Sequence, residues 1–213
     1  VSSLAKVLSS GALGVKKKRR IVPTRWSITA VDSNLSNYFI EEKLPQHKLI
    51  DSFELFHSKY LDNDFWIMLL PYPWSFEQIE VWLPGGVWNK SATEFNILSD
   101  YELNSGLVGY PKETEGAYFA ARLAVCEYLY EKKLNASAIV FREIGKGYAV
   151  PLGVWQIREN VRAALKEKPL TFSTLDLTLE FLSKKLSVPI LQYKKKSFLI
   201  QQFKSQTRLN QWF

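Results

Sequence analysis

The spacing of apolar and polar residues predicts a mixture of helices and strands. The strongest helix is expected over residues 115–133, where apolar residues recur at helical spacing. They include Phe119, Leu123, Cys126 and Tyr130. The opposite side of this segment carries further Ala and Val residues. A helix that is apolar nearly all round is a buried one, so this segment is predicted to lie in the core.

Other helices are expected over residues 2–14, 34–44, 154–168 and 173–186. Asp32 and Ser33 are candidate N-caps for the second of these helices, and Pro45 would end it. Ser173 is the expected cap of the last one.

Strands are expected where β-branched and aromatic residues alternate with polar ones. The segments concerned are 21–31, 52–60, 64–83 with breaks at Pro71 and Pro73, 137–144, 147–153, and a final hairpin over 188–193 and 197–203. The order of these segments lacks a regular βαβ rhythm, which favours an α+β fold. We expect a mixed, largely antiparallel sheet packed with several helices. Residues 1–200 would form a single domain, and residues 201–213 a flexible C-terminal peptide.

Composition and charge narrow the class of protein. Of 213 residues, 46% are hydrophobic and the formal net charge is +7, which indicates a folded basic domain with polyanionic partners such as DNA. Cys126 is the single cysteine, so the chain has no disulfide framework or cysteine-rich zinc site, as is typical of a reducing compartment. The chain has neither an apolar run near 20 residues nor a signal-peptide pattern. We expect a cytoplasmic, nucleoid-associated protein with no membrane contact.

Cations are concentrated near the N-terminus. The candidate phosphate-binding residues are Lys16, Lys17, Lys18, Arg19, Arg20 and Arg25. Guanidinium groups bind phosphate bidentately, and a helix N-terminus expected near Asp32 and Ser33 would add amide donors. Trp26 could stack on a base, but its preferred interpretation is a core residue. Arg25 would then pair with a buried acid such as Glu127 or Glu143.

Charged residues within the expected core form a second set of candidates. Arg122 and Glu127 interrupt the apolar helix and need partners, because an unpaired buried charge costs several kcal/mol, on the order of 3–5. The candidate catalytic residues are Asp32, Arg122, Glu127, Arg142 and Glu143. They could form a structural network or line an active cleft, and the carboxylates together with Glu80 could bind a divalent metal. No known catalytic or metal-binding spacing is present, so neither a metal site nor a cofactor is predicted.

The chain ends in "QTRLNQWF", which places two large aromatic residues at the terminus. One helical turn would bring Leu209, Trp212 and Phe213 onto a single face, with Gln206 one turn earlier. An apolar face of this kind can fill a partner's groove. The alternative is a terminal segment that docks on its own core.

This terminal pattern resembles the motif that binds DNA sliding clamps of the proliferating cell nuclear antigen (PCNA) type. The resemblance implies that Leu209, Trp212 and Phe213 enter the clamp's hydrophobic pocket. Gln206 would enter a smaller polar one.

Three longer segments resemble blocks of the archaeal Nre family. They are "KKKRRIVPTRWSITAVDSNLS", "EGAYFAARLAVCEYL" and "REIGKGYAVPLGVWQIRENVR". The resemblance implies a role in DNA repair and a C-terminal clamp-binding motif. Members of this family typically begin with a cysteine cluster resembling a zinc finger. With Cys126 alone, either that module has been removed from this chain or this member lacks it, and no zinc site carries over.

The leading hypothesis is a DNA repair factor that is recruited to the PCNA clamp by its C-terminal motif and contacts DNA through a basic surface. The alternative is a metal-dependent nuclease or a nucleotide-processing enzyme targeted to the clamp. Whether the core is catalytic stays open at this point.

Overall fold

A mixed β-sheet forms the centre of the protein in a computed structural model, which describes residues 2–12, 21–150 and 152–209, with the backbone path alone for 206–209. Within these ranges the main sheet has six strands in the order β5-β4-β7-β3-β2-β8. Neighbouring strands are antiparallel, except that β4 and β7 run parallel. The bounds are β2 Phe53–Tyr60, β3 Asn63–Leu70, β4 Phe76–Trp82, β5 Asn96–Glu102, β7 Ser137–Ile144 and β8 Leu170–Phe172. A small separate parallel pair joins β1 Lys48–Leu49 to β6 Leu134–Asn135.

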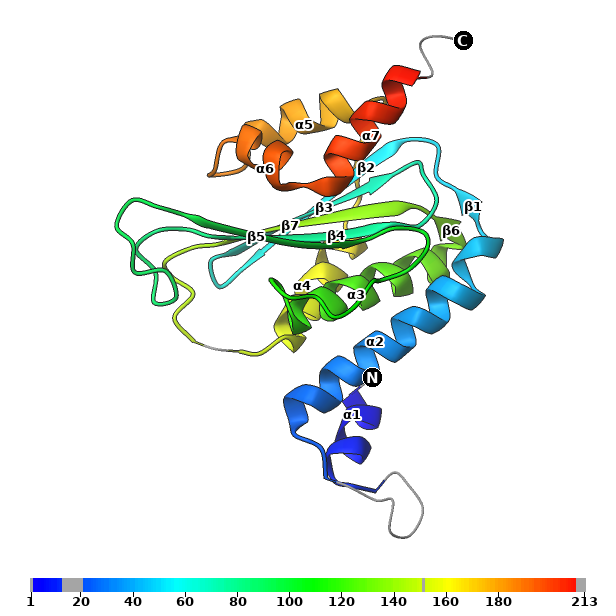
Figure 1. Ribbon diagram of the computed structural model, residues 1–213, viewed down its shortest axis with the longest axis vertical. Coiled ribbons are helices and arrows are strands. Elements are labelled where there is room, and N and C mark those ends of the chain that lie inside the picture. Colours follow the sequence, from blue (N-terminus) through cyan, green and yellow to red (C-terminus); the bar gives the residue numbers. More distant parts are fainter. Residues whose placement is uncertain (1, 13–20, 151, 210–213) are drawn as a thin grey trace.

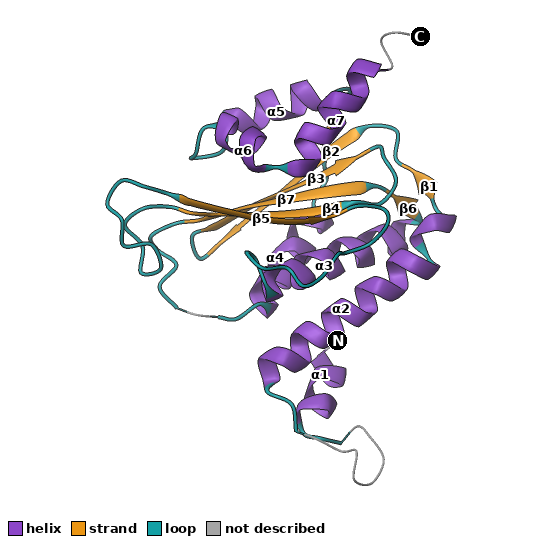
Figure 2. Ribbon diagram, viewed as in Figure 1, coloured by secondary structure: helices purple, strands orange, loops and turns teal. Residues whose placement is uncertain are grey.

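Helices cover both faces of the main sheet (Figures 1 and 2). One face carries α5 Leu175–Ser183, α6 Ile190–Lys196 and α7 Phe198–Leu209. The other face carries α3 Gly116–Lys132 and α4 Trp155–Lys166. Beyond them, α2 Thr24–Glu42 packs on α3, α1 Ser2–Ser9 packs on α2, and the 3₁₀ turn η2 Leu44–Gln46 follows α2. The expected α+β class is therefore confirmed.

The central strands are buried on both faces, and alternate residues of each strand enter two different cores. On the α3–α4 side, Phe65, Ile67 and Val140 pack with Phe119 and Ile157. The core on the α5–α7 side includes Met68, Phe141, Leu179, Tyr193 and Phe203. Within the described ranges, no helix combines the length and apolar character that a membrane span requires.

Several predicted elements are confirmed. The buried helix over 115–133 is α3, and the strand over 137–144 is β7. The expected helices over 2–14, 154–168 and 173–186 correspond to α1, α4 and α5, with ends shifted by a few residues. The cap of α5 is Thr174, whose Oγ1 accepts a hydrogen bond from the Leu177 amide, and not Ser173.

The prediction for residues 21–44 was wrong. The expected strand and the helix behind it form one helix, α2, which begins at Thr24 after Pro23. Asp32 is therefore a buried residue in the middle of a helix and not an N-cap, and Ser33 is also internal. The buried stripe of α2 consists of Ser27, Asp32, Ser36 and Ile40. Because this stripe is mostly polar, apolar periodicity does not reveal the helix.

The predictions of a strand over 147–153 and of a terminal hairpin over 188–203 were also wrong. The described part of the first segment is a loop, and the second forms α6 and α7. Two buried carboxylates attach these helices to the sheet. Glu143 accepts hydrogen bonds from the Ser187 and Val188 amides and from the Tyr193 hydroxyl. Glu77 accepts them from the Phe198 and Leu199 amides and from Ser99 and Ser197.

Candidate nucleic-acid interface

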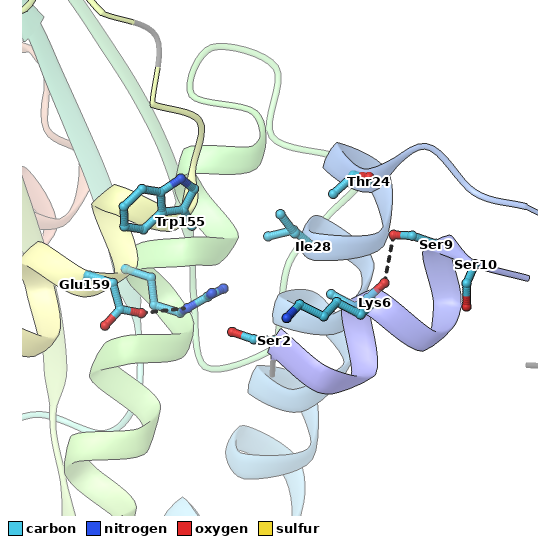
Figure 3. A pocket seen from close by; sticks show the side chains of 10 residues that line it. Ser2, Lys6, Ser9, Ser10, Thr24, Ile28, Trp155 and Glu159 are labelled. Atoms are coloured by element: carbon cyan, nitrogen blue, oxygen red, sulfur yellow. Dashed lines mark hydrogen bonds and ion pairs between the residues drawn. The ribbon is translucent and has the colours of Figure 1, made fainter. Parts of the chain in front are cut away.

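A cavity of about 690 Å³ lies where α1 meets the first turns of α2 and α4 (Figure 3). We call it the Arg158 pocket. It is lined by Ser2, Ala5, Lys6, Ser9, Ser10, Thr24, Ile28, Trp155, Arg158 and Glu159. Its volume falls in the usual range for small-molecule sites, roughly 300–1,000 Å³.

Arg158 is the most deeply buried charge of this pocket, with 3% of its surface exposed. Its Nη1 donates a hydrogen bond to Oδ1 of Asp32, which is fully buried on α2. Its Nε is buried with no hydrogen-bond partner among the described residues and lies 3.7 Å from Oε1 of Glu159. Arg158 thus reaches the pocket wall with part of its hydrogen-bonding capacity unused.

Asp32 compensates Arg158 only in part. Burial raises the pKa of the Asp32 carboxyl from 3.8 to about 6, although the neighbouring Arg158 and Arg162 act to lower it. Its Oδ2 also lacks a hydrogen-bond partner within the part of the chain that the structure describes. The negative charge opposite Arg158 is therefore costly to form and is lost at mildly acidic pH.

Glu159 at the pocket rim is held by a second arginine. Arg162 donates from Nη1 to Glu159 Oε1 at 2.7 Å and binds Glu127 through Nε and Nη2, each at 2.8 Å. Arg162 lies one helical turn after Arg158 on α4, while Glu127 comes from α3. This chain of ion pairs fixes the position of the rim carboxylate and links α4 to both α2 and α3.

The remaining wall provides an aromatic surface, an amine and a helix start. The indole of Trp155 is 47% exposed and lies across the pocket from Lys6 of α1 (Figure 3). Thr24 marks the first turn of α2, where Pro23 offers no polar side chain to cap the amides. Unbonded amides at a helix start attract anions. The pocket therefore combines anion-binding groups with a surface on which a planar ring can stack.

The predicted phosphate-binding residues fall into two groups. Lys16, Lys17, Lys18, Arg19 and Arg20 lie outside the described residues. Arg25 is exposed on the first turn of α2, with its guanidinium 5.9 Å from the Trp26 ring centroid. Trp26 is 59% exposed, so the interpretation of Trp26 as a core residue was wrong. The helix start expected near Asp32 lies instead at Thr24, next to Arg25.

The candidate catalytic residues do not converge on one site. Arg122 is buried and binds Glu102, Ser36 and Asn37, which joins α3 to β5 and α2. Arg142 binds Glu80 and Asn63 on the α3–α4 side of the sheet, whereas Glu143, the next residue of β7, faces α6. In the described part of the chain, no three His, Cys, Asp or Glu side chains gather as a metal site.

The residues grouped around Arg158 were not predicted from the sequence. Neither Arg158 nor Trp155 was among the candidate residues. The i, i+4 spacing of Arg158 and Arg162 indicated a charged stripe on α4. Nothing in the sequence indicated that Asp32, 126 residues away, would face that stripe.

The C-terminal helix α7 is anchored through its first half. Leu199, Ile200 and Phe203 are buried against the sheet and α5–α6, and Lys204 lies 3.0 Å from Asp176 of α5. Gln206 and Leu209 occupy the last turn of α7, which points away from the rest of the molecule (Figure 1). Trp212 and Phe213 lie outside the described residues.

The chain matches two family models. Residues 1–89 match the one described as "Archaeal Nre, N-terminal", and residues 102–212 match "Archaeal Nre, C-terminal". No solved structure gives a significant match.

Curated relatives extend this result. The "DNA repair protein NreB" of Archaeoglobus fulgidus is 41% identical over 97% of this chain and 52% of its own length. The "DNA repair protein NreA" of Haloferax volcanii is 39% identical over 90% of the chain and 46% of its own length. The chain thus spans about half the length of the curated relatives it matches. Because the C-terminal model alone covers more than half of it, the chain belongs to the archaeal Nre family.

Proposed function

We propose that this protein acts in DNA repair and is recruited to a PCNA-type sliding clamp by its C-terminal segment, residues 206–213. Support for the repair role comes from the relatives named as DNA repair proteins. Support for the recruitment comes from the terminal pattern of Gln206, Leu209, Trp212 and Phe213.

The observation that supports this proposal most directly is that the buried contacts of α7 end just before the motif begins. Phe203 is buried and Ser205 is exposed, and the motif begins directly afterwards at Gln206. The backbone of α7 continues as a helix to Leu209, away from the sheet. A clamp pocket could therefore engage the motif while the buried contacts that hold α7 stay in place.

The affinity would come mostly from the two aromatic residues. Aromatic anchors buried in a pocket commonly contribute above about 2 kcal/mol each, whereas one net hydrogen bond from Gln206 contributes about 1 kcal/mol. Motifs of this size commonly bind with about micromolar affinity. A ring with several pockets then raises occupancy through effective concentration.

The test is to replace Trp212 and Phe213 together with Ala and to measure binding to an archaeal sliding clamp by calorimetry. We expect binding to be abolished, while the melting temperature stays within about 1 °C of the wild type, since surface changes away from the core alter stability little. The matched control replaces Thr207 and Asn210 with Ala, because the helical spacing places them off the aromatic face. If the aromatic variant unfolds and the wild type shows no clamp binding, the recruitment proposal is wrong and the terminus belongs to the core.

The proposal includes DNA contact through the start of α2. Arg25 is exposed there, and Arg20 precedes Thr24 by only four residues. Arg25 can therefore bind a phosphate held near this helix start, since a guanidinium binds phosphate bidentately.

A further inference from the structure

We propose that the Arg158 pocket binds one nucleotide of a DNA strand, with its phosphate against Arg158 and Lys6 and its base against Trp155. This inference rests on the proposed DNA repair role and names the ligand that the interface would hold. The pocket contains recognition groups for both halves of a nucleotide.

The phosphate would bind at Arg158. Arg158 lines the pocket, and Asp32 and Glu159 on either side of its guanidinium hold it in position. A guanidinium that is held in place loses little further side-chain freedom on binding, which favours its use for a phosphate. Lys6 supplies a second cation from α1, and Thr24 supplies a hydroxyl beside the uncapped start of α2.

Two acids lie near this site, and each is paired with an arginine. Asp32 lies behind Arg158 and is fully buried. Glu159 at the rim is bound by Arg162 at 2.7 Å, and its Oε1 also lies 3.7 Å from the Nε of Arg158. The cations facing an incoming ligand are then Arg158 and Lys6, with Arg25 exposed on the same turn as Thr24.

The base would stack on Trp155. A tryptophan nearly half exposed at the edge of a cavity leaves a large aromatic face open to solvent. Such faces stack on bases with little sequence preference. Figure 3 shows the Trp155 ring on the opposite side of the pocket from Lys6, with Ile28 between them on α2. This separation places a stacking surface and a cation at two ends of one cavity.

Trp155 also connects the pocket to a second cavity of about 280 Å³. That cavity is lined by Ser58, Lys59, Tyr60, Trp155, Gln156, Glu159, Asn160 and Ala163. Tyr60 is 56% exposed and adds a second aromatic side chain, and Lys59 adds another cation. A single strand could thus continue past Trp155, so we infer that the nucleotide belongs to unpaired DNA.

The test uses the full chain and two probes, a fluorescent 5′-phosphorylated oligodeoxythymidylate of about ten nucleotides and thymidine 5′-monophosphate. Trp155→Ala should weaken oligonucleotide binding about tenfold, within the range for the removal of one stacked base. Lys6→Gln should weaken binding several-fold and lower the salt dependence by about one phosphate contact. The mononucleotide should compete for the site, and thymidine without phosphate should compete far less.

Two control variants separate the pocket from general surface effects. Trp88→Ala removes an exposed tryptophan of the β4–β5 loop that does not line the pocket, and Lys168→Gln removes an exposed lysine elsewhere. Both should bind the oligonucleotide within about twofold of the wild type, as expected for surface positions outside an interface. If all four variants bind equally well, or if inorganic phosphate competes as strongly as the mononucleotide, the nucleotide assignment is wrong.

The results that would overturn the pocket differ from those that would overturn the proposed function. Suppose that DNA affinity falls only when Arg19, Arg20 and Arg25 are replaced. The proposed DNA contact through basic residues would then stand, and the proposed nucleotide site in the Arg158 pocket would be wrong. Clamp binding without saturable binding of either probe would overturn the pocket and leave recruitment standing.

Discussion

Asp32 occupies a position in α2 where an apolar residue would be expected, because the opposite face of the helix is exposed and this one is buried. Its partner Arg158 comes from α4, and Ser36, one turn later, accepts a hydrogen bond from Arg122 of α3. The contacts of α2 with the body of the protein thus include buried polar pairs in addition to the apolar packing of Ile40 and Phe39. Removing one partner from such a pair leaves a buried charge uncompensated, which is more costly than the pair itself is stabilising.

The Asp32 carboxyl predicts a pH dependence of stability. Its pKa is about 6 in the folded protein and 3.8 ordinarily, so the folded state keeps a proton that the unfolded state releases between these values. Its contribution is therefore fully present below about pH 4 and is lost as the pH rises through about 6. The loss is on the order of 3 kcal/mol, since one pKa unit corresponds to about 1.4 kcal/mol.

Asp32→Asn should remove this part of the pH profile, because the amide stays neutral and can still accept a hydrogen bond from Arg158. Urea unfolding of both proteins between about pH 4 and 8, the range over which the proton is released, measures the difference. Glu167→Gln, at an exposed position after α4, controls for the removal of one carboxyl from the chain. Parallel profiles for the wild type and Asp32→Asn would show that Asp32 is ionised throughout this range.

At the scale of elements, the α5–α7 layer depends on the start of α7. The Ser197 hydroxyl donates to Glu77 at 2.6 Å and accepts from the Ile200 amide at 3.0 Å. It therefore caps the helix and attaches it to β4 at the same time. Burial raises the pKa of Glu77, and the hydrogen bonds from Ser197, Ser99 and the α7 amides oppose that shift.

Ser197→Ala should destabilise the protein by about 1–3 kcal/mol, because it removes an N-cap and one donor to a buried carboxylate. Ser205→Ala, later in the same helix, should change stability by less than about 0.5 kcal/mol, since its hydroxyl is exposed. Denaturant midpoints and slopes of the two variants give the comparison. Equal effects would mean that α7 is held by its apolar face alone.

The whole molecule carries a formal net charge of +7, and its densest cationic sequence leads into the first turn of α2. The Arg158 pocket opens at that same turn. The C-terminal helix lies on the opposite side of the sheet (Figure 1). A clamp bound at the C-terminus and DNA bound near α2 would therefore engage different faces of the protein.

This arrangement predicts salt-dependent DNA binding that does not need the C-terminal motif. Replacing Arg19, Arg20 and Arg25 with Ala should reduce the slope of log affinity against log salt by about 0.7–0.9 for each phosphate that these arginines neutralise. Lys168→Ala, which removes an exposed cation elsewhere, should leave the slope unchanged. Anisotropy titrations from about 50 to 300 mM salt measure it. An unaltered slope in the triple variant would exclude these arginines from the interface.

The sequence alone determined the elements in which apolar residues recur at regular spacing within one segment of the chain. The helix α3 and the strand β7 are examples, because each repeats a strong hydrophobic pattern over its whole length. It also indicated the family through three distinctive blocks, and it located the basic run and the terminal motif. Each of these features depends only on residues that are close together in the chain.

The tertiary structure alone decided α2, α6, α7 and the Arg158 pocket. In α2 the buried stripe is polar, so its helical period becomes apparent only when Arg122 and Arg158 are placed against it. The segments that form α6 and α7 are rich in residues that favour strands, yet they are helical. Glu77 of the sheet binds the first amides of α7, and Glu143 binds the hydroxyl of Tyr193 in α6. The pocket brings Lys6, Thr24 and Arg158 together from three helices. Partners this distant in the chain leave no local periodicity, because the energy that joins them arises only when the helices pack.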